Sequence, residues 1–186
     1  MKFWTIQDHN VKDIIDRNGI YQPDFNKSRY LKFDESAGPL FDFLLQSYNK
    51  VNKTQLPGLI FSFAISDDNR IYEINNLEEF IDFIRNKKNV LGCLYDYLTN
   101  SAGLIFELEF DNVNPIFVDL NDFQLLMPVI EIYPPYTMQS LYRILKSIRS
   151  GVPIVSDFPS HILQAHLPSI KRENVINVFD EKTIFF

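Results

Sequence analysis

The hydrophobic positions in the first third of the chain predict a strand, two helices and a second strand. Met1–Ile6 has the apolar run of a short strand, and the helix that follows is capped by Asn10 and ended by Asn18-Gly19. Ala37–Val51 carries apolar residues at helical spacing, whereas Leu59–Ile65 is a largely apolar run typical of a buried strand. After the first helix, Ile20–Asn26 is expected to form an exposed turn or loop.

The next part of the chain predicts a hairpin and two short helices. Arg70–Ile74 is expected to return as the hairpin partner of the preceding strand. Asn76 followed by Glu79 resembles a capping arrangement and begins a helix, and Val90–Leu98 predicts another short helix.

Leu104–Phe110 is the clearest strand, because every second residue is apolar and the residues between them form a second set on the opposite face. That second set includes Glu107 and Glu109, which lie two residues apart on one face, roughly 6–7 Å between Cα atoms. Ile116–Leu120 predicts a further strand across the intervening turn. The two carboxylates either belong to a solvated strand face or divide acid and base roles between them.

The last third predicts one helix among several short strands. The helix is capped by Thr137 and ended by Ser150-Gly151. The predicted strands are Phe123–Met127, Val129–Tyr133, Ile154-Val155, Ile162–His166, Val175–Val178 and Ile184–Phe186. Because the strands do not alternate regularly with helices, the sequence predicts an α+β fold, with residues 1–186 forming a single domain of mixed or antiparallel sheets and flanking helices.

The acidic composition of the chain limits the kinds of macromolecule that it is expected to bind. The net charge of −6 and the pI near 5.0 argue against a broad phosphate-binding surface, since nucleic-acid affinity rests largely on clustered Lys and Arg. Direct, broad nucleic-acid binding is therefore not expected, whereas a protein partner with a basic surface is compatible with this charge.

The compartment is expected to be the cytoplasm. Cys93 is the one cysteine, so the chain has no internal disulfide, and it lies among apolar residues that favour an inert, buried thiol. No signal peptide and no apolar run of about 20 residues is found, so no membrane association is expected.

Metal and phosphate-loop chemistry are not predicted. His161 and His166 are five residues apart, a spacing that suits neither a helix face nor a strand face, and no cysteine or close carboxylate cluster joins them. No Gly-rich phosphate loop occurs among the 6 glycines.

Four stretches of the sequence resemble one family. They are Trp4-Thr5-Ile6-Gln7; Phe41-Asp42-Phe43-Leu44; Phe106–Phe110 running on to Val118–Phe123; and Gln164-Ala165 through Ile170–Val175. In their order and spacing, the chain resembles an uncharacterised bacterial and phage family, the domain of unknown function numbered 3841. This family supplies no reaction.

A more distant resemblance concerns the two ends of the chain. A first strand bearing a polar residue, then a short helix ending in Gly, is similar to the opening of ADP-ribosyltransferase-like domains. Gln164-Ala165-His166, followed by Pro168 and Ile170, is similar to the late Gln-Ala-Glu strand of DNA-modifying members. The resemblance implies that NAD is the cofactor and that the late residue, here His166 in place of Glu, organises the nicotinamide ribose. The alternative is that His166 is a partly buried, hydrogen-bonded structural histidine beside Pro168.

Two functions follow as expectations. In the first, the chain is an ADP-ribosyltransferase-like NAD-binding domain, active or catalytically degenerate. Its catalytic candidates are His166, Gln164, Glu107 and Glu109, and its cofactor-binding candidates are Thr5, Gln7 and Tyr21. Thr5 and Gln7 share a strand face, at a nucleotide pocket or at a sheet edge, and Tyr21 offers a stacking ring. In the second, it is a non-catalytic, phage- or mobile-element-encoded binding protein that inhibits a host defence complex.

Overall fold

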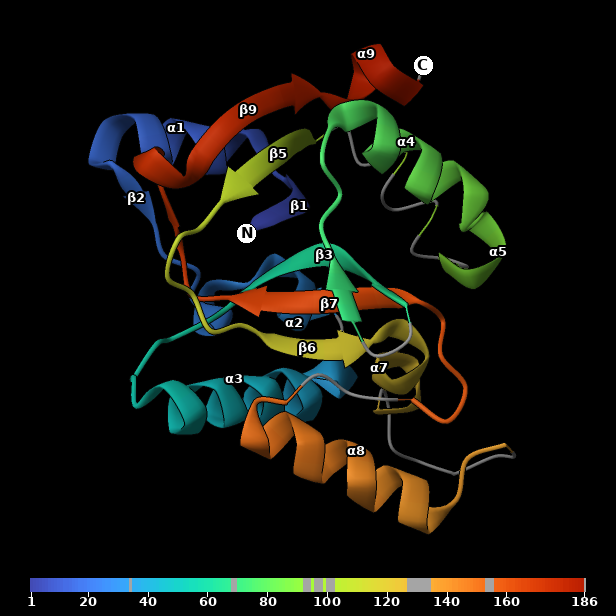
Figure 1. Ribbon diagram of the computed structural model, residues 1–186. Coiled ribbons are helices and arrows are strands. Elements are labelled where there is room, and N and C mark those ends of the chain that lie inside the picture. Colours follow the sequence, from blue (N-terminus) through green and yellow to red (C-terminus); the bar gives the residue numbers. More distant parts are fainter. Residues whose placement is uncertain are drawn as a thin grey trace.

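An antiparallel sheet lies at the centre of the molecule (Figure 1). The computed structural model describes residues 1–33, 35–67, 70–91, 95, 99, 103–126, 135–152 and 156–185. Within them, a seven-stranded sheet has the order β6-β7-β3-β1-β5-β9, with β4 paired to β3, and a two-stranded sheet joins β2 to β8. The strands are β1 (Lys2–Gln7), β2 (Ile20–Tyr21), β3 (Ile60–Asp67), β4 (Arg70–Tyr72), β5 (Leu104–Glu109), β6 (Ile116–Asp119), β7 (Ile162–Leu167), β8 (Ile170–Lys171) and β9 (Val175–Asp180).

Helices flank this sheet. They are α1 (His9–Asn18), α2 (Arg29–Phe33), α3 (Gly38–Asn52), α4 (Leu77–Asn86), α5 (Lys88–Leu91), α7 (Leu120–Leu126), α8 (Met138–Ser150) and α9 (Glu181–Phe185). In Figure 1, α3 and α8 lie together beyond β6, whereas α4 and α5 lie at the other end of the molecule. None of the described helices is long and apolar enough to cross a membrane.

The central strands bury both of their faces. On one face, Phe3 and Leu163 belong to a core that includes Val11 and Ile15 of α1. On the other face, Trp4 and its neighbours pack against α4, and the side chains of β6 pack against α3, α7 and α8. Successive side chains of a strand point to opposite faces. A strand residue that belongs to one of these cores therefore shows which face its neighbours along the strand point to.

The sheet consists of two halves that meet at a narrow junction. Within the described residues, β1 pairs with β3 at Trp4 and Phe63, whereas the β1–β5 and β3–β7 ladders each have six register pairs. In Figure 1, β1, β5 and β9 accordingly turn away from β3, β7 and β6. The pairings are all antiparallel within these residues, and the predicted α+β class with flanking helices is confirmed.

Most predicted elements and their caps are confirmed. The side chain of Asn76 accepts a hydrogen bond from the Glu79 amide at the start of α4, and Thr137 does the same for Ser140 at the start of α8. Gly151 ends α8 with a φ of 68°, which glycine adopts without strain. The predicted hairpin is present, since β4 pairs antiparallel with β3.

Two predictions near the N-terminus are wrong. The cap of α1 is Asp8 rather than Asn10, because the Asp8 carboxylate accepts the Asn10 amide at 2.8 Å. Ile20 and Tyr21, expected in a loop, form β2 and pair with β8, so the segment after α1 is tied to a strand 150 residues away in sequence.

Two further corrections concern segments that were predicted as strands but form helices. Residues 123–126 end α7, because Asp119 accepts the Asn121 amide and so turns the chain into a helix directly after β6. Residues 184–185 belong to α9, where Asp180 accepts the Lys182 amide. In addition, β6 pairs with β7 and not with β5 across the turn.

Some predictions lie outside the described residues. They concern residues 127 and 129–133, residues 154–155, Cys93, most of Val90–Leu98, and Phe186.

Candidate functional site

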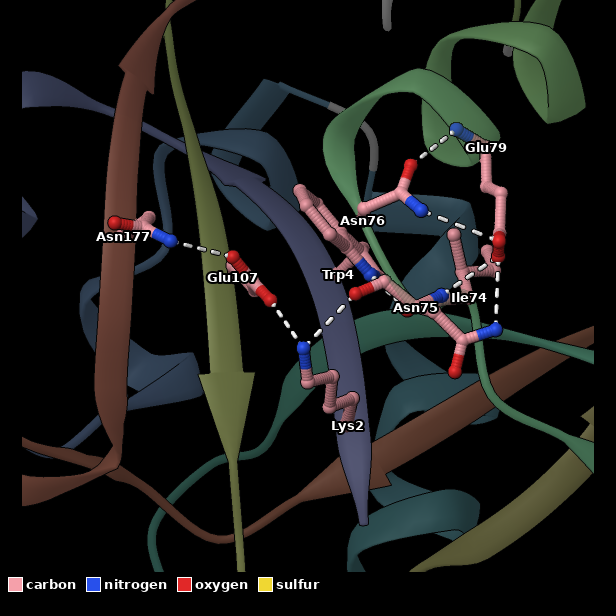
Figure 2. Close-up of polar contacts among 8 residues, drawn as sticks. All are labelled: Lys2, Trp4, Ile74, Asn75, Asn76, Glu79, Glu107 and Asn177. Carbon is pink, nitrogen blue, oxygen red and sulfur yellow. Dashed lines mark hydrogen bonds and ion pairs between the residues drawn. The ribbon is translucent and has the colours of Figure 1, made fainter.

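Glu107 lies at the centre of a polar cluster that joins three strands (Figure 2). Its Oε1 accepts from the ammonium group of Lys2 at 2.7 Å, and its Oε2 accepts from the amide of Asn177 at 2.7 Å. Lys2 lies on β1 and Asn177 on β9, on either side of β5, so side chains of one sheet face meet across neighbouring strands. Both carboxylate oxygens of Glu107 are therefore hydrogen-bonded inside the protein.

The same cluster connects β1 to the start of α4. Lys2 donates a second bond to the carbonyl of Asn75 at 2.8 Å, and Trp4 donates its indole N–H to the carbonyl of Ile74 at 2.6 Å. Glu79 accepts bonds from Asn75 and Asn76 in return (Figure 2). The hydrogen bond that Lys2 donates to Glu107 raises the pKa of Lys2, and the bond from the Asn75 amide lowers the pKa of Glu79.

Of the two carboxylates, the expectation of a solvated strand face holds for Glu109 but not for Glu107. Glu107 is 5% exposed, because the sheet is covered on both faces, whereas Glu109 is exposed at the end of β5. The two groups therefore have different surroundings, although they share a strand face. The bonds from Lys2 and Asn177 fix the position of the Glu107 side chain between β1 and β9.

His166 and Gln164 lie in the core on β7. His166 is 0% exposed, and its ring packs edge-on against Phe61 at 4.7 Å between centroids. Its Nδ1 lies 3.1 Å from the carbonyl oxygen of Ile116, and its Nε2 lies 3.0 Å from Oε1 of Gln164. Burial lowers the pKa of His166 to about 4, so the ring is neutral at pH 7 and has one N–H to donate.

The three cofactor candidates also have internal contacts. Thr5 donates its hydroxyl to the carbonyl of Phe61 at 2.7 Å, and it accepts the side-chain amide of Gln7 at 2.8 Å. Tyr21 is half-buried on β2 against the core that contains Phe3, and burial raises its pKa.

The candidates fall on opposite faces of the sheet. Thr5 pairs with Phe106, which belongs to the same core as Phe3, and Gln7 follows it on that face. Gln164 pairs instead with Phe63, a member of the core around Trp4, and His166 follows it on that second face.

Glu107 pairs with Trp4 and so shares the face of Gln164. In the sheet order, however, β5 is three strands from β7, or roughly 14 Å. The structure thus brings Thr5, Gln7 and Tyr21 to one face and Gln164 and His166 to the other, with Glu107 and Glu109 apart from both groups.

A second polar cluster, around Asp122, was not among the candidates. Asp122 is 0% exposed, and its Oδ1 accepts the hydroxyls of Tyr136 at 3.0 Å and Ser156 at 2.9 Å. Among the described residues, its Oδ2 has no hydrogen-bond partner. Burial raises the pKa of Asp122 to about 6 and that of Tyr136 to about 12.

Asp119 supports this cluster from the end of β6. Its carboxylate accepts the amides of Ser160 and Asn121, and burial raises its pKa. Next to Ser160, His161 has a φ of 62°, an uncommon conformation for a residue with a β-carbon. The one sequence signal for these acids was the stretch Val118–Phe123, which contributes to the family resemblance.

Neither a search for metal-binding groups nor comparison with known proteins assigns a function to these clusters. Within the described part of the chain, no group of three or more His, Cys, Asp or Glu side chains could hold a metal ion. No protein-family model matches the chain, and no curated protein or solved structure matches it. Function is therefore argued from the geometry of these clusters.

Proposed function

We propose that this chain is a non-catalytic binding protein on an ADP-ribosyltransferase-like scaffold, and that its partner is a protein with a basic surface. One observation carries the first half of the proposal. His166, at the position where the resemblance places the ribose-binding Glu, is fully buried and bonded to the protein itself. A ribose would have to displace these contacts, and leaving a buried polar group unpaired costs about 1–3 kcal/mol.

The distribution of the other candidates supports the same proposal. A cofactor pocket opens on one side of a sheet, but Thr5 and Gln164 point to opposite faces. Both carboxylate oxygens of Glu107 already accept hydrogen bonds inside the protein, from Lys2 and Asn177. The geometry therefore favours a scaffold in which these residues stabilise the fold.

The charge of the chain supports a basic partner. The net charge is −6, and five exposed acids lie on α4, just before it and at the end of β5. These exposed acids are Glu73, Glu78, Glu79, Asp82 and Glu109. Glu78 and Glu79 also complement the helix dipole, whereas Asp82 and Glu73 have no such role. An acidic surface steers a basic partner toward it. A family with bacterial and phage members suggests a host defence complex as the target.

The catalytic half of the proposal is tested with NAD. Calorimetric titration with millimolar NAD, combined with labelled NAD and candidate acceptors, is expected to give no binding heat and no label transfer. Saturable heat that Thr5→Val abolishes and the exposed control Glu78→Gln retains would instead support a degenerate NAD site. Label transfer would overturn the non-catalytic proposal.

The binding half is tested in the native host. Affinity purification with the wild-type chain is expected to recover a basic protein in stoichiometric amount. The variant Glu78→Lys/Asp82→Lys is expected to weaken that association at least tenfold, while Asp16→Lys on α1 retains it. Equal recovery by all three chains, or no partner, contradicts an interaction through the acidic surface.

A further inference from the structure

Asp122 connects three segments of the chain. It lies on α7, whereas Tyr136 immediately precedes the Thr137 cap of α8 and Ser156 lies in the loop before β7. Ser156 also accepts the Phe158 amide, and the rings of Tyr136 and Phe158 meet edge-on at 5.7 Å. The carboxyl group is thus the shared contact between α7, the start of α8 and the loop that leads to β7.

Neither charge state of Asp122 is fully satisfied. As a carboxylate it has two donors on Oδ1 and, among the described residues, none on Oδ2. As a neutral carboxyl group it retains the hydroxyl bonds on Oδ1 and carries its proton on Oδ2. An unpaired buried charge costs more than an unpaired buried dipole, so the closed arrangement favours the neutral carboxyl group over the carboxylate.

The charged groups around Asp122 reinforce this preference. Asp119 of β6 and Asp157 of the loop repel a negative charge on Asp122. Arg143 of α8 is the facing cation within the described elements, but it is half-exposed and forms an ion pair with Asp157. His161 acts on Asp119 rather than on Asp122. Tyr136 stays neutral across the physiological range, since burial raises its pKa to about 12.

We propose that Asp122 is a proton-operated latch between α7, the start of α8 and the loop before β7. With the proton bound, Tyr136 and Ser156 close on the carboxyl group. When the proton is lost, a charged oxygen without a donor remains in the core, and hydration of that oxygen opens the contact. Opening separates the Tyr136–Phe158 ring pair. This device is independent of the NAD and partner proposals.

The direction of the pH effect follows from linkage. The closed state binds the proton with a pKa of about 6, whereas the open state has the ordinary value of 3.8. Below pH 3.8 both states are protonated and the latch contributes its full stability. That contribution is lost as the pH rises from 3.8 to about 6, because only the open state ionises freely in this window.

Hydrogen exchange on the full chain tests the latch. With intrinsic rates corrected, the opening equilibrium of peptides covering residues 120–126, 135–140 and 156–160 is expected to rise roughly fiftyfold from pH 4 to pH 7. Asp122→Asn should remove this pH dependence. The measured quantity is the slope of the opening equilibrium against pH. The absolute protection is not compared, because Asn brings two N–H donors to the site and changes it. Asp42→Asn, an exposed acid on α3, should retain the wild-type slope.

Tyr136→Phe separates a latch from a merely structural contact. The Tyr136 hydroxyl lowers the pKa of Asp122, so its removal should move the midpoint of opening to higher pH. A purely structural role would increase opening equally at every pH. Wild-type protection that is independent of pH, or a slope that persists in Asp122→Asn, would overturn the proposal.

Discussion

Glu107 and Asp122 are both buried carboxylates, but their surroundings give them opposite properties. Glu107 has the ammonium group of Lys2 on one oxygen and the Asn177 amide on the other. Asp122 has two neutral hydroxyls on one oxygen and, within the described residues, no partner on the other. Burial alone therefore does not identify a functional acid. What distinguishes the two sites is whether the protein compensates the charge that it buries.

The largest expected effect comes from removing the cation beside Glu107. Lys2→Met leaves a carboxylate that is 5% exposed without its charge partner, which is expected to destabilise the fold by about 3 kcal/mol. Urea unfolding at pH 7 measures the change.

The matched control for that variant is Lys12→Met. Lys12 pairs with Asp16 on the surface of α1, so its loss should cost less than about 1 kcal/mol. Equal losses in the two variants would mean that the Glu107 cluster resembles a surface ion pair.

A second prediction concerns His166, whose contribution to stability changes with pH in the opposite direction to that of Asp122. Its pKa is about 4 in the folded protein and 6.5 in the unfolded chain, so its stabilising contribution is present above pH 6.5 and is lost as the pH falls toward 4. The difference in unfolding free energy between wild type and His166→Gln should therefore fall by about 3 kcal/mol from pH 6.5 to pH 4.

The opposite pH dependences of the His166 and Asp122 contributions to stability have a measurable consequence. In the wild type the His166 and Asp122 contributions partly cancel between pH 4 and pH 6, because one gains and the other loses stability as the pH rises. The double variant with Asp122→Asn should show neither contribution. A His166→Gln difference that is flat with pH would exclude a neutral, buried ring.

The smallest expected effect is that of Asp157→Asn. Asp157 is over one-third exposed and pairs with Arg143 on the surface, where solvent screens the attraction, so its removal should change the stability of the fold only slightly. Because Asp157 raises the pKa of Asp122, however, the Asp122 carboxyl should titrate at lower pH. Carbon-detected NMR of the Asp122 carboxyl checks this shift, and an unchanged midpoint would remove Asp157 from the cluster.

The structure of α7 illustrates how far local sequence reasoning reaches. The apolar run from Phe123 satisfies the pattern of a buried strand as well as that of a short buried helix, since such runs lack a distinguishing period. The Asp119 side chain decides between them by capping the helix. Caps with a clear spacing, such as Asn76 with Glu79, were predicted because both partners lie within one turn.

The candidate site shows the same limit over longer distances. Alternation along β5 placed Glu107 and Glu109 on one face, but the sequence did not reveal that Lys2 and Asn177 flank Glu107 from two other strands. Thr5 and Gln164 each lie on predicted strands, yet their separation on opposite faces follows from the register of β1, β3 and β7.

By itself, the sequence determined the α+β class, most of the helices and strands, and the caps of α4 and α8, because these depend on periodicity and on partners a few residues apart. Only the tertiary structure decided which carboxylates are buried, which of them has a cation, and that Asp122 has an oxygen without a donor. Those properties depend on contacts between residues 14 to 105 positions apart, which strand order and helix packing create and which no local pattern encodes.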